Sequence, residues 1–125
     1  MTKKTYDTSG KVAGAPYSVA VEANGTLYVS GQVPLDAKTG KLVAGDIKTQ
    51  TEQVFVNLKS ALAEAGLSLH HVTKATVFMT NLGDFGAMNE VYAKHMPAPF
   101  PARSTVQVAA LPLGAMVEIE VIAVR

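Results

Sequence analysis

Apolar and polar residues alternate along six short stretches of the chain, and apolar residues recur every three or four positions along two longer ones. Alternation is typical of a β-strand with one buried face, whereas the longer period is typical of a helix packed on a core. The alternation predicts strands at residues 4–7, 17–23, 26–33, 72–80, 103–108 and 115–124. The helical period predicts helices at residues 47–65 and 85–95.

Residue types at the segment ends support this assignment. Asp46 is a favourable N-cap for the first helix, and Gly66 is a favourable residue to end it. Asp84 is placed to cap the second helix, and Pro97 follows its end. The order of strands, helix, strand, helix and two strands predicts a single α+β domain over residues 1–125, with both helices on one face of a mixed sheet.

Two loops predict hairpins. The pair Asn24-Gly25 favours a two-residue turn, because both positions tolerate a positive φ. The Pro- and Gly-containing loop at 111–114 predicts that the last two strands also pair with each other. Gln107 would then lie opposite Glu118, and Thr105 opposite Glu120. The alternate residues would face the helices: Val106, Val108, Val117, Ile119 and Val121.

Arg103 would share the polar face with Glu118. Arginine is suited to bidentate recognition of a planar carboxylate, although the outer face of an antiparallel sheet also carries ordinary solvated side chains. We call the sheet face without helices the open face. It is expected to be too apolar for water, because it would include Val19, Val21, Tyr28 and Met116. We therefore expect a homo-oligomer, with Arg103 in clefts between subunits where a small anion could bind.

Composition limits the function classes. The formal charge is +1 and no basic run is present, so nucleic-acid binding is not indicated. Cysteine is absent, which excludes disulfides and thiolate chemistry. No signal peptide or membrane segment is visible, and a soluble, cytoplasmic protein is expected. The spacing of His70, His71 and His95 matches no metal motif, and Ser30 and Ser104 lack a nucleophile elbow.

Two further positions have alternative interpretations. Glu118 and Glu120 could form an acid–base pair or could be surface residues, and Glu118 is favoured because Arg103 and Gln107 are expected nearby. Gly31 could mark a bulge, or a close approach of a ligand or another backbone, or an ordinary strand end.

Several motifs resemble the RidA family (reactive intermediate imine deaminases, also called YjgF), in order and over almost the whole chain. They include Pro16-Tyr17-Ser18, Val29-Ser30-Gly31-Gln32, Thr76-Val77-Phe78-Met79-Thr80, Met88-Asn89-Glu90-Val91-Tyr92, Pro101-Ala102-Arg103-Ser104 and Glu118-Ile119-Glu120. The resemblance implies a chorismate-mutase-like (ferredoxin-like) fold and a homotrimer with three clefts between subunits. It also implies hydrolysis of 2-iminobutanoate and 2-iminopropanoate to 2-keto acids and ammonia, without a cofactor or a metal.

Site residues follow from the same resemblance. Arg103 matches the arginine that binds the substrate carboxylate, and Glu118 matches the carboxylate near the attacking water. The remaining cleft positions correspond to Tyr17, Ser30, Gly31, Asn89 and Thr105. The family often has Cys where this chain has Thr105, and Gly where it has Ala15, which bears on the range of substrates.

Two other functions are compatible with part of the pattern. The clefts could hold a keto acid or a similar anion without turnover and thereby regulate a partner. RNA cleavage or inhibition of translation has been proposed for family members, but the near-neutral charge and the absence of an aromatic stacking platform argue against nucleic acid as a partner.

Overall fold

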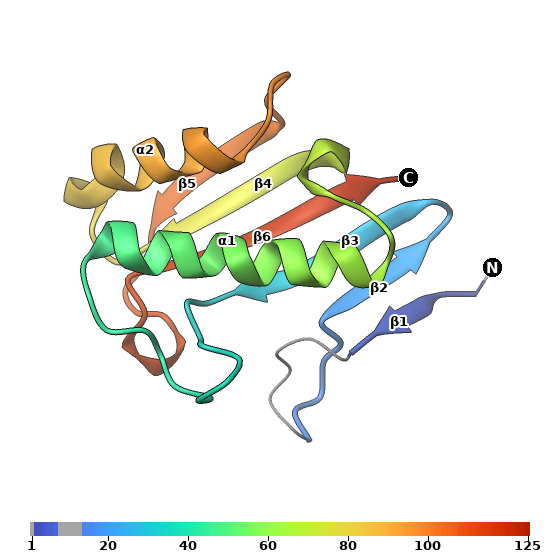
Figure 1. Cartoon of the computed structure of the whole chain (residues 1–125), viewed down its shortest axis with the longest axis horizontal. Coiled ribbons are helices and arrows are strands. Elements are labelled where there is room, and N and C mark those ends of the chain that lie inside the picture. The colour runs from blue at the N-terminus through green and yellow to red at the C-terminus, as the bar shows by residue number, and fades with distance from the viewer. Residues whose placement is uncertain (1, 8–13) are drawn as a thin grey trace.

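The computed structural model describes residues 2–7 and 14–125, which form a six-stranded sheet with two helices on one face (Figure 1). The strands are β1 (Lys4–Tyr6), β2 (Ala20–Ala23), β3 (Thr26–Gln32), β4 (Val72–Met79), β5 (Ala102–Gln107) and β6 (Val117–Val124). The helices are α1 (Ile47–Glu64) and α2 (Phe85–His95), and short 3₁₀ turns lie at Leu69–His71, Leu82–Asp84 and Pro112–Gly114. The α+β prediction with both helices on one face is confirmed.

The ends of α1 are those that its sequence predicts. The carboxylate of Asp46 accepts a hydrogen bond from the backbone N–H of Thr49 at 2.9 Å, and Gly66 follows the helix with φ +73°. The prediction that Asp84 caps α2 was wrong, because its side chain makes no capping hydrogen bond. Asp84 already has near-helical backbone angles (φ −90°, ψ 7°) at the end of a 3₁₀ turn, whereas a capping side chain needs an extended residue.

The hairpin between β2 and β3 is confirmed. Asn24 and Gly25 both have positive φ, at 52° and 77°, and Val21 lies opposite Tyr28. The strand begins at Ala20, so the prediction that it starts at Tyr17 was wrong. Further along β3 the register with β6 shifts between Val29 and Gln32, which confirms a bulge around Gly31.

The pairing predicted for the last two strands was wrong. The sheet order is β1-β2-β3-β6-β4-β5, so β5 and β6 are separated by β4. β5 runs parallel to β4 because α2 connects them as a crossover, and a parallel pair requires such a connection. β6 enters between β3 and β4, where Glu118 lies opposite Phe78 and Glu120 opposite Thr76. Neither glutamate therefore pairs with β5.

The new pairing reverses the faces of β5. Arg103 lies opposite Ala75, which is fully buried under the helices, so Arg103 is on the helix side and not on the open face. Val106, expected toward the helices, is 41% exposed on the other side, and Val108 lies beyond the strand. Alternation along β5 shows which side chains share a face. It does not show which of the two faces lies under the helices, because that depends on the partner strand and its direction.

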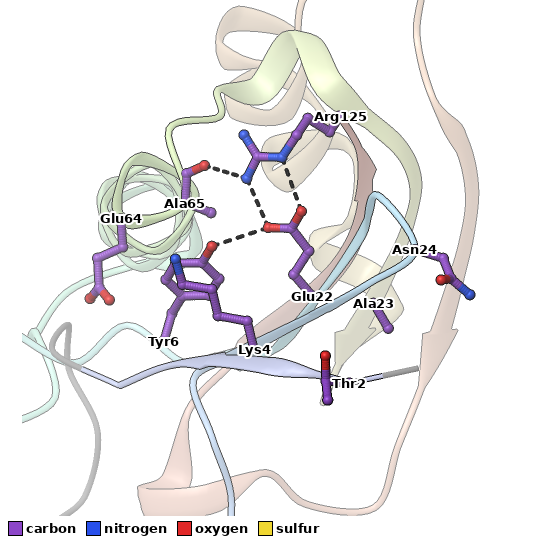
Figure 2. Close-up of a pocket in the computed structure, with 9 residues that line it drawn as sticks. All are labelled: Thr2, Lys4, Tyr6, Glu22, Ala23, Asn24, Glu64, Ala65 and Arg125. Atoms are coloured by element: carbon purple, nitrogen blue, oxygen red, sulfur yellow. Dashed lines mark hydrogen bonds and ion pairs between the residues drawn. The ribbon is translucent and has the colours of Figure 1, made fainter.

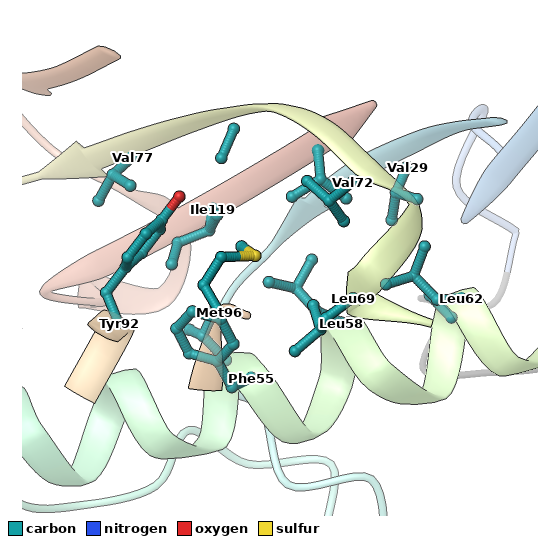
Figure 3. Packing of buried hydrophobic residues seen from close by; sticks show 14 of the residues in the cluster. Val29, Phe55, Leu58, Leu62, Leu69, Val72, Val77, Tyr92, Met96 and Ile119 are labelled. Atoms are coloured by element: carbon teal, nitrogen blue, oxygen red, sulfur yellow. The ribbon is translucent and has the colours of Figure 1, made fainter. Parts of the chain in front are cut away.

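The core lies between the sheet and the helices (Figure 3). Its largest side chains are fully buried, and they come from both helices and the central strands: Leu27, Phe55, Leu58, Leu62, Met79, Met88, Met96 and Ile119. Val19 is 2% exposed and belongs to this core, and Met116 packs against it, so neither contributes to the open face as predicted. Tyr28, 51% exposed, and Val21 do lie there.

Candidate functional site

Arg103 is held by two side chains of α2. Its Nη1 donates a hydrogen bond to Oδ1 of Asn89 at 2.7 Å, and its guanidinium lies over the ring of Tyr92 at 4.6 Å from the centroid. The ring of Phe85 lies 5.6 Å away on the same helix. Phe85, Asn89 and Tyr92 are spaced by four and three residues, which places them on one face of α2. We call these residues, with Thr105 two positions along β5, the Arg103 group.

The charge of Arg103 is not compensated by a carboxylate in the part of the chain that the structure describes. Guanidinium is always charged in proteins and offers five donors in a planar fork. One donor is bound by an amide oxygen and one face is stacked on a ring, so the remaining donors are oriented but available. This arrangement favours binding of a small carboxylate anion.

Two hydroxyls near Arg103 lack partners. The phenol of Tyr92 and Oγ1 of Thr105 are buried and make no hydrogen bond within residues 2–7 and 14–125. Figure 3 shows the phenol directed toward the sheet at Val77, and Val77 lies opposite Thr105 in the β4–β5 pair. Burial raises the pKa of Tyr92, and the charge of Arg103 offsets part of that rise, so Tyr92 stays protonated at neutral pH.

Glu118 lies against the bulge of β3. A Cβ built on Gly31 would overlap Oε2 of Glu118, so a side chain at this position would displace the carboxylate. Ser30, next in the bulge, donates a hydrogen bond from Oγ to the carbonyl of Ser18 at 2.6 Å. Tyr17 precedes Ser18 and is 41% exposed, and this chain connection is what relates it to the bulge. We call Ser30, Gly31 and Glu118 the Glu118 group.

The carboxyl of Glu118 is electrostatically perturbed. Burial, and after it the like charge of Glu120, raise its pKa above the ordinary range of glutamate. A carboxyl with a raised pKa can exchange a proton closer to neutral pH, which suits a group that positions or activates water.

The two groups lie on opposite faces of the sheet. Arg103 is on the helix side of edge strand β5, whereas Glu118 alternates with the buried Val117 and Ile119 and is on the open face of β6. The structure thus brings Arg103, Asn89 and Thr105 together, and brings Glu118 together with Gly31 and Ser30. It does not bring Arg103 and Glu118 of one chain into a single cleft.

Tyr92 and Phe85 were not predicted as site residues. Both are aromatic residues of the helix predicted at residues 85–95, where the apolar period favours packing on the core, and Tyr92 does pack on Phe55 of α1 with ring centroids 5.7 Å apart. Their spacing from Asn89 was the available signal, because residues three and four positions apart share a helix face. That signal became informative only once Arg103 was placed under α2.

A pocket at the other edge of the sheet contains no residue of either group (Figure 2). Arg125 forms two hydrogen bonds to the carboxylate of Glu22, at 2.8 and 3.0 Å, and a third to the carbonyl of Ala65 at 2.7 Å. The phenol of Tyr6 also donates to Glu22, at 3.1 Å. Arg125 and Glu22 are paired with each other, and with Tyr6 these contacts tie β1, β2 and the end of β6 together. No helix in the described ranges is long and apolar enough to cross a membrane.

Comparison with known proteins agrees with this fold. Residues 8–125 match the protein family described as Endoribonuclease L-PSP. The mouse protein named 2-iminobutanoate/2-iminopropanoate deaminase is 44% identical over 118 residues, which cover 94% of this chain and 87% of the mouse protein. Protein DfrA of Myxococcus xanthus is 49% identical over 120 residues, covering 94% and 91%.

Solved structures give the same result. YyfA from Yersinia pestis, described as a member of the conserved Rid protein family, matches with a TM-score of 0.95 and 45% identity over 99% of this chain and all of that one. The YjgF product of E. coli matches with a TM-score of 0.89 and 39% identity, over 98% of both chains. Sequence and fold agree over nearly the full length, and this chain belongs to the RidA family, also called the YjgF family.

Proposed function

We propose that this protein hydrolyses reactive 2-imino acids, with 2-iminobutanoate and 2-iminopropanoate as the substrates, to 2-keto acids and ammonia. The single observation that carries the proposal is the guanidinium of Arg103, fixed by Asn89 and Tyr92 and left without a carboxylate partner among the described residues. The name of the mouse relative, a 2-iminobutanoate/2-iminopropanoate deaminase at 44% identity, supports the substrate class.

Arg103 would bind the carboxylate that all 2-imino acids share. Two parallel N–H···O bonds fix both the position and the plane of that group. Asn89 and the ring of Tyr92 reduce the freedom of the guanidinium before substrate arrives, so less entropy is lost on binding. The imino carbon would then be held at a defined distance from the cleft wall opposite Arg103.

Glu118 would act on the water. A protonated imine is already electrophilic, so the protein mainly has to orient it and supply a positioned nucleophile. Ionised Glu118 accepts a hydrogen bond from water and directs the oxygen lone pair to the imino carbon, and its raised pKa lets it receive the proton released during attack. Glu118 then returns that proton to the amino group of the tetrahedral intermediate, the C–N bond breaks to release ammonia, and the hydroxyl gives up its proton to Glu118 as the keto acid forms.

The complete site would form between two copies of the chain. The Arg103 group of one copy lies at edge strand β5, and the Glu118 group lies on the open face, which also exposes Tyr28 and Val124. Covering that face with a second copy buries apolar surface and places the two groups in one cleft. We propose a homotrimer, in which each copy contributes its Arg103 group to one cleft and its Glu118 group to another.

A coupled assay tests the activity. Threonine and a threonine dehydratase generate 2-iminobutanoate, and the decay of the imine is followed with and without this protein. We expect faster decay with catalytic amounts of protein. Binding of 2-ketobutyrate without faster decay would support the alternative of a non-catalytic anion-binding protein. RNA cleavage, suggested by the family description, is measured in parallel, and cleavage without imine turnover would overturn the proposal.

A further inference from the structure

A second cluster of titratable side chains lies on the helix layer, between α1 and α2. Nε2 of His95 is 2.5 Å from Oε1 of Glu52, and Nδ1 of the same ring is 3.0 Å from Nζ of Lys59. The second oxygen of Glu52 pairs with Lys94 at 2.5 Å. The imidazole thus bridges a carboxylate and an amine, both on α1, and none of these residues belongs to the Arg103 or Glu118 group.

The contacts define how His95 is protonated when it is neutral. A carboxylate only accepts hydrogen bonds, so Nε2 must carry the proton that it shares with Glu52. Nδ1 then presents its lone pair to Lys59, and the ammonium donates to it. The ring is held flat against Phe55, with centroids 5.0 Å apart and 14° between planes, and its side chain is only 17% exposed. The acceptor is therefore fixed in position.

We propose that Lys59 is a modification site for small acyl donors such as acyl phosphates, with His95 as its general base. His95 removes one proton from the ammonium of Lys59, and Glu52 stabilises the imidazolium that forms. The amine lone pair then attacks the acyl carbon. The C–O bond to phosphate breaks, and the product is an amide. One amine proton passes through His95 to solvent, and the second leaves with the phosphate.

The position of Lys59 makes it accessible to such a reagent. Lys59 is exposed, and it belongs to α1, which lies on the sheet face opposite the open face (Figure 1). Self-association through the open face would leave the helix layer uncovered. The proposal is thus independent of the imine-deaminase proposal, since it uses neither the same residues nor the same surface.

The chain provides matched reference lysines. Lys48 is on the same helix but pairs with a carboxylate, that of Glu90 at 2.6 Å, which raises the pKa of Lys48 through a hydrogen bond and charge attraction. Lys38 is exposed in the loop that leads to α1. Among the described residues, neither reference lysine has an imidazole partner. Acetylation of all three can be followed in one sample, so reagent concentration and time cancel in the ratios.

The experiment treats the intact protein with acetyl phosphate at pH 7.5 and measures acetylation at each lysine by peptide mass spectrometry over time. We expect Lys59 to react roughly tenfold faster than Lys38, and faster still relative to Lys48, because a positioned base accelerates proton removal. His95→Gln should bring the rate at Lys59 down to that of Lys38. Glu52→Gln keeps a hydrogen-bond acceptor but removes the charge, so an intermediate rate is expected.

The ratios also control for folding. If a variant loosened the helix layer, the ion pair of Lys48 with Glu90 would open and acetylation at Lys48 would rise as well. Equal rates at Lys59 and Lys38 in the unaltered protein would overturn the proposal, whatever the variants do. An unchanged ratio in a folded His95→Gln protein would overturn the role of the imidazole.

Discussion

Arg103 is the residue on which the proposed reaction depends most directly. Arg103→Ala removes the carboxylate anchor, whereas Arg103→Lys keeps the charge but not the planar fork. A charge-assisted hydrogen bond contributes about 1.5–3 kcal/mol, so losing a bidentate pair should lower kcat/KM by roughly two to four powers of ten. We expect no measurable turnover for Ala and a small remainder for Lys. Near-normal imine decay in a folded Arg103→Ala protein would contradict this role.

Glu118 predicts a pH dependence. Burial and the charge of Glu120 raise its pKa, so the ionised form is lost at a higher pH than for an ordinary glutamate. If the ionised form directs water, kcat/KM falls as the pH drops through that raised pKa. Glu120→Gln removes the like charge, lowers the pKa of Glu118 and should move the acid limb to lower pH. Glu118→Gln should lose most turnover yet still bind 2-ketobutyrate. An acid limb that does not move in Glu120→Gln would show that another group titrates.

At the scale of elements, the bulge of β3 creates the space for Glu118. Gly31→Ala places a methyl group where Oε2 stands, and the flexible end of Glu118 has to move. Because the strain can be relieved by one side chain, we expect thermal stability to change little and turnover to fall strongly. Gln32→Ala is the control, since it removes a hydrogen bond to the carbonyl of Ser30 in the same bulge without occupying that space. Equal activity of Gly31→Ala and the unaltered protein would mean that the position of Glu118 is not critical.

Elements defined by neighbouring residues could be predicted from the sequence, including the β2–β3 hairpin, whereas strand partners distant in sequence could not. Asp46 and Gly66 determine where α1 begins and ends through local hydrogen bonds and backbone angles, so the prediction was accurate. The residues of the loop before β6 predicted a hairpin turn. In the structure Leu113 adopts φ +62° within a 3₁₀ turn, and the chain continues to the middle of the sheet. Strand order depends on contacts distant in sequence, which alternation does not encode.

The unpredicted strand order also limited what the sequence could show of the candidate site. Resemblance to a family identified Arg103, Asn89 and Thr105, and the structure brings them together on one side of β5. The parallel β4–β5 pair places Arg103 on the helix side of the sheet, whereas Glu118 is on the open face. Tyr92 contacts Arg103 because α2 lies on that same helix side. Neither point could be predicted without the strand order.

At the scale of the whole molecule, the separation of the two groups predicts complementation. We expect a trimer by sedimentation, and we expect Arg103→Ala and Glu118→Gln each to be inactive alone. Co-expressed, they should recover activity, because a cleft can take intact Arg103 from one copy and intact Glu118 from the other. With random mixing in a closed ring, about one quarter of clefts hold both intact residues.

The control for this experiment is a mixture of two variants of the same group. Arg103→Ala mixed with Asn89→Ala places both defects on the same side of every cleft. Recovery in the first mixture but not in the control would support a shared cleft. A clean monomer, or no recovery from mixed oligomers shown to contain both variants, would exclude it.

The central position of β6 has a consequence for how the chain folds during synthesis. β6 is the last strand in sequence, yet it lies between β3 and β4 and pairs with both. Until residues 117–124 leave the ribosome, β1–β3 and β4–β5 are two separate ribbons, each with an unpaired strand edge. The sheet therefore stays incomplete until residues 117–124 have been synthesised, and the closing step joins segments distant in sequence, which slows folding. Before that step, chaperones that protect exposed strand edges would have two such edges to bind on the nascent chain.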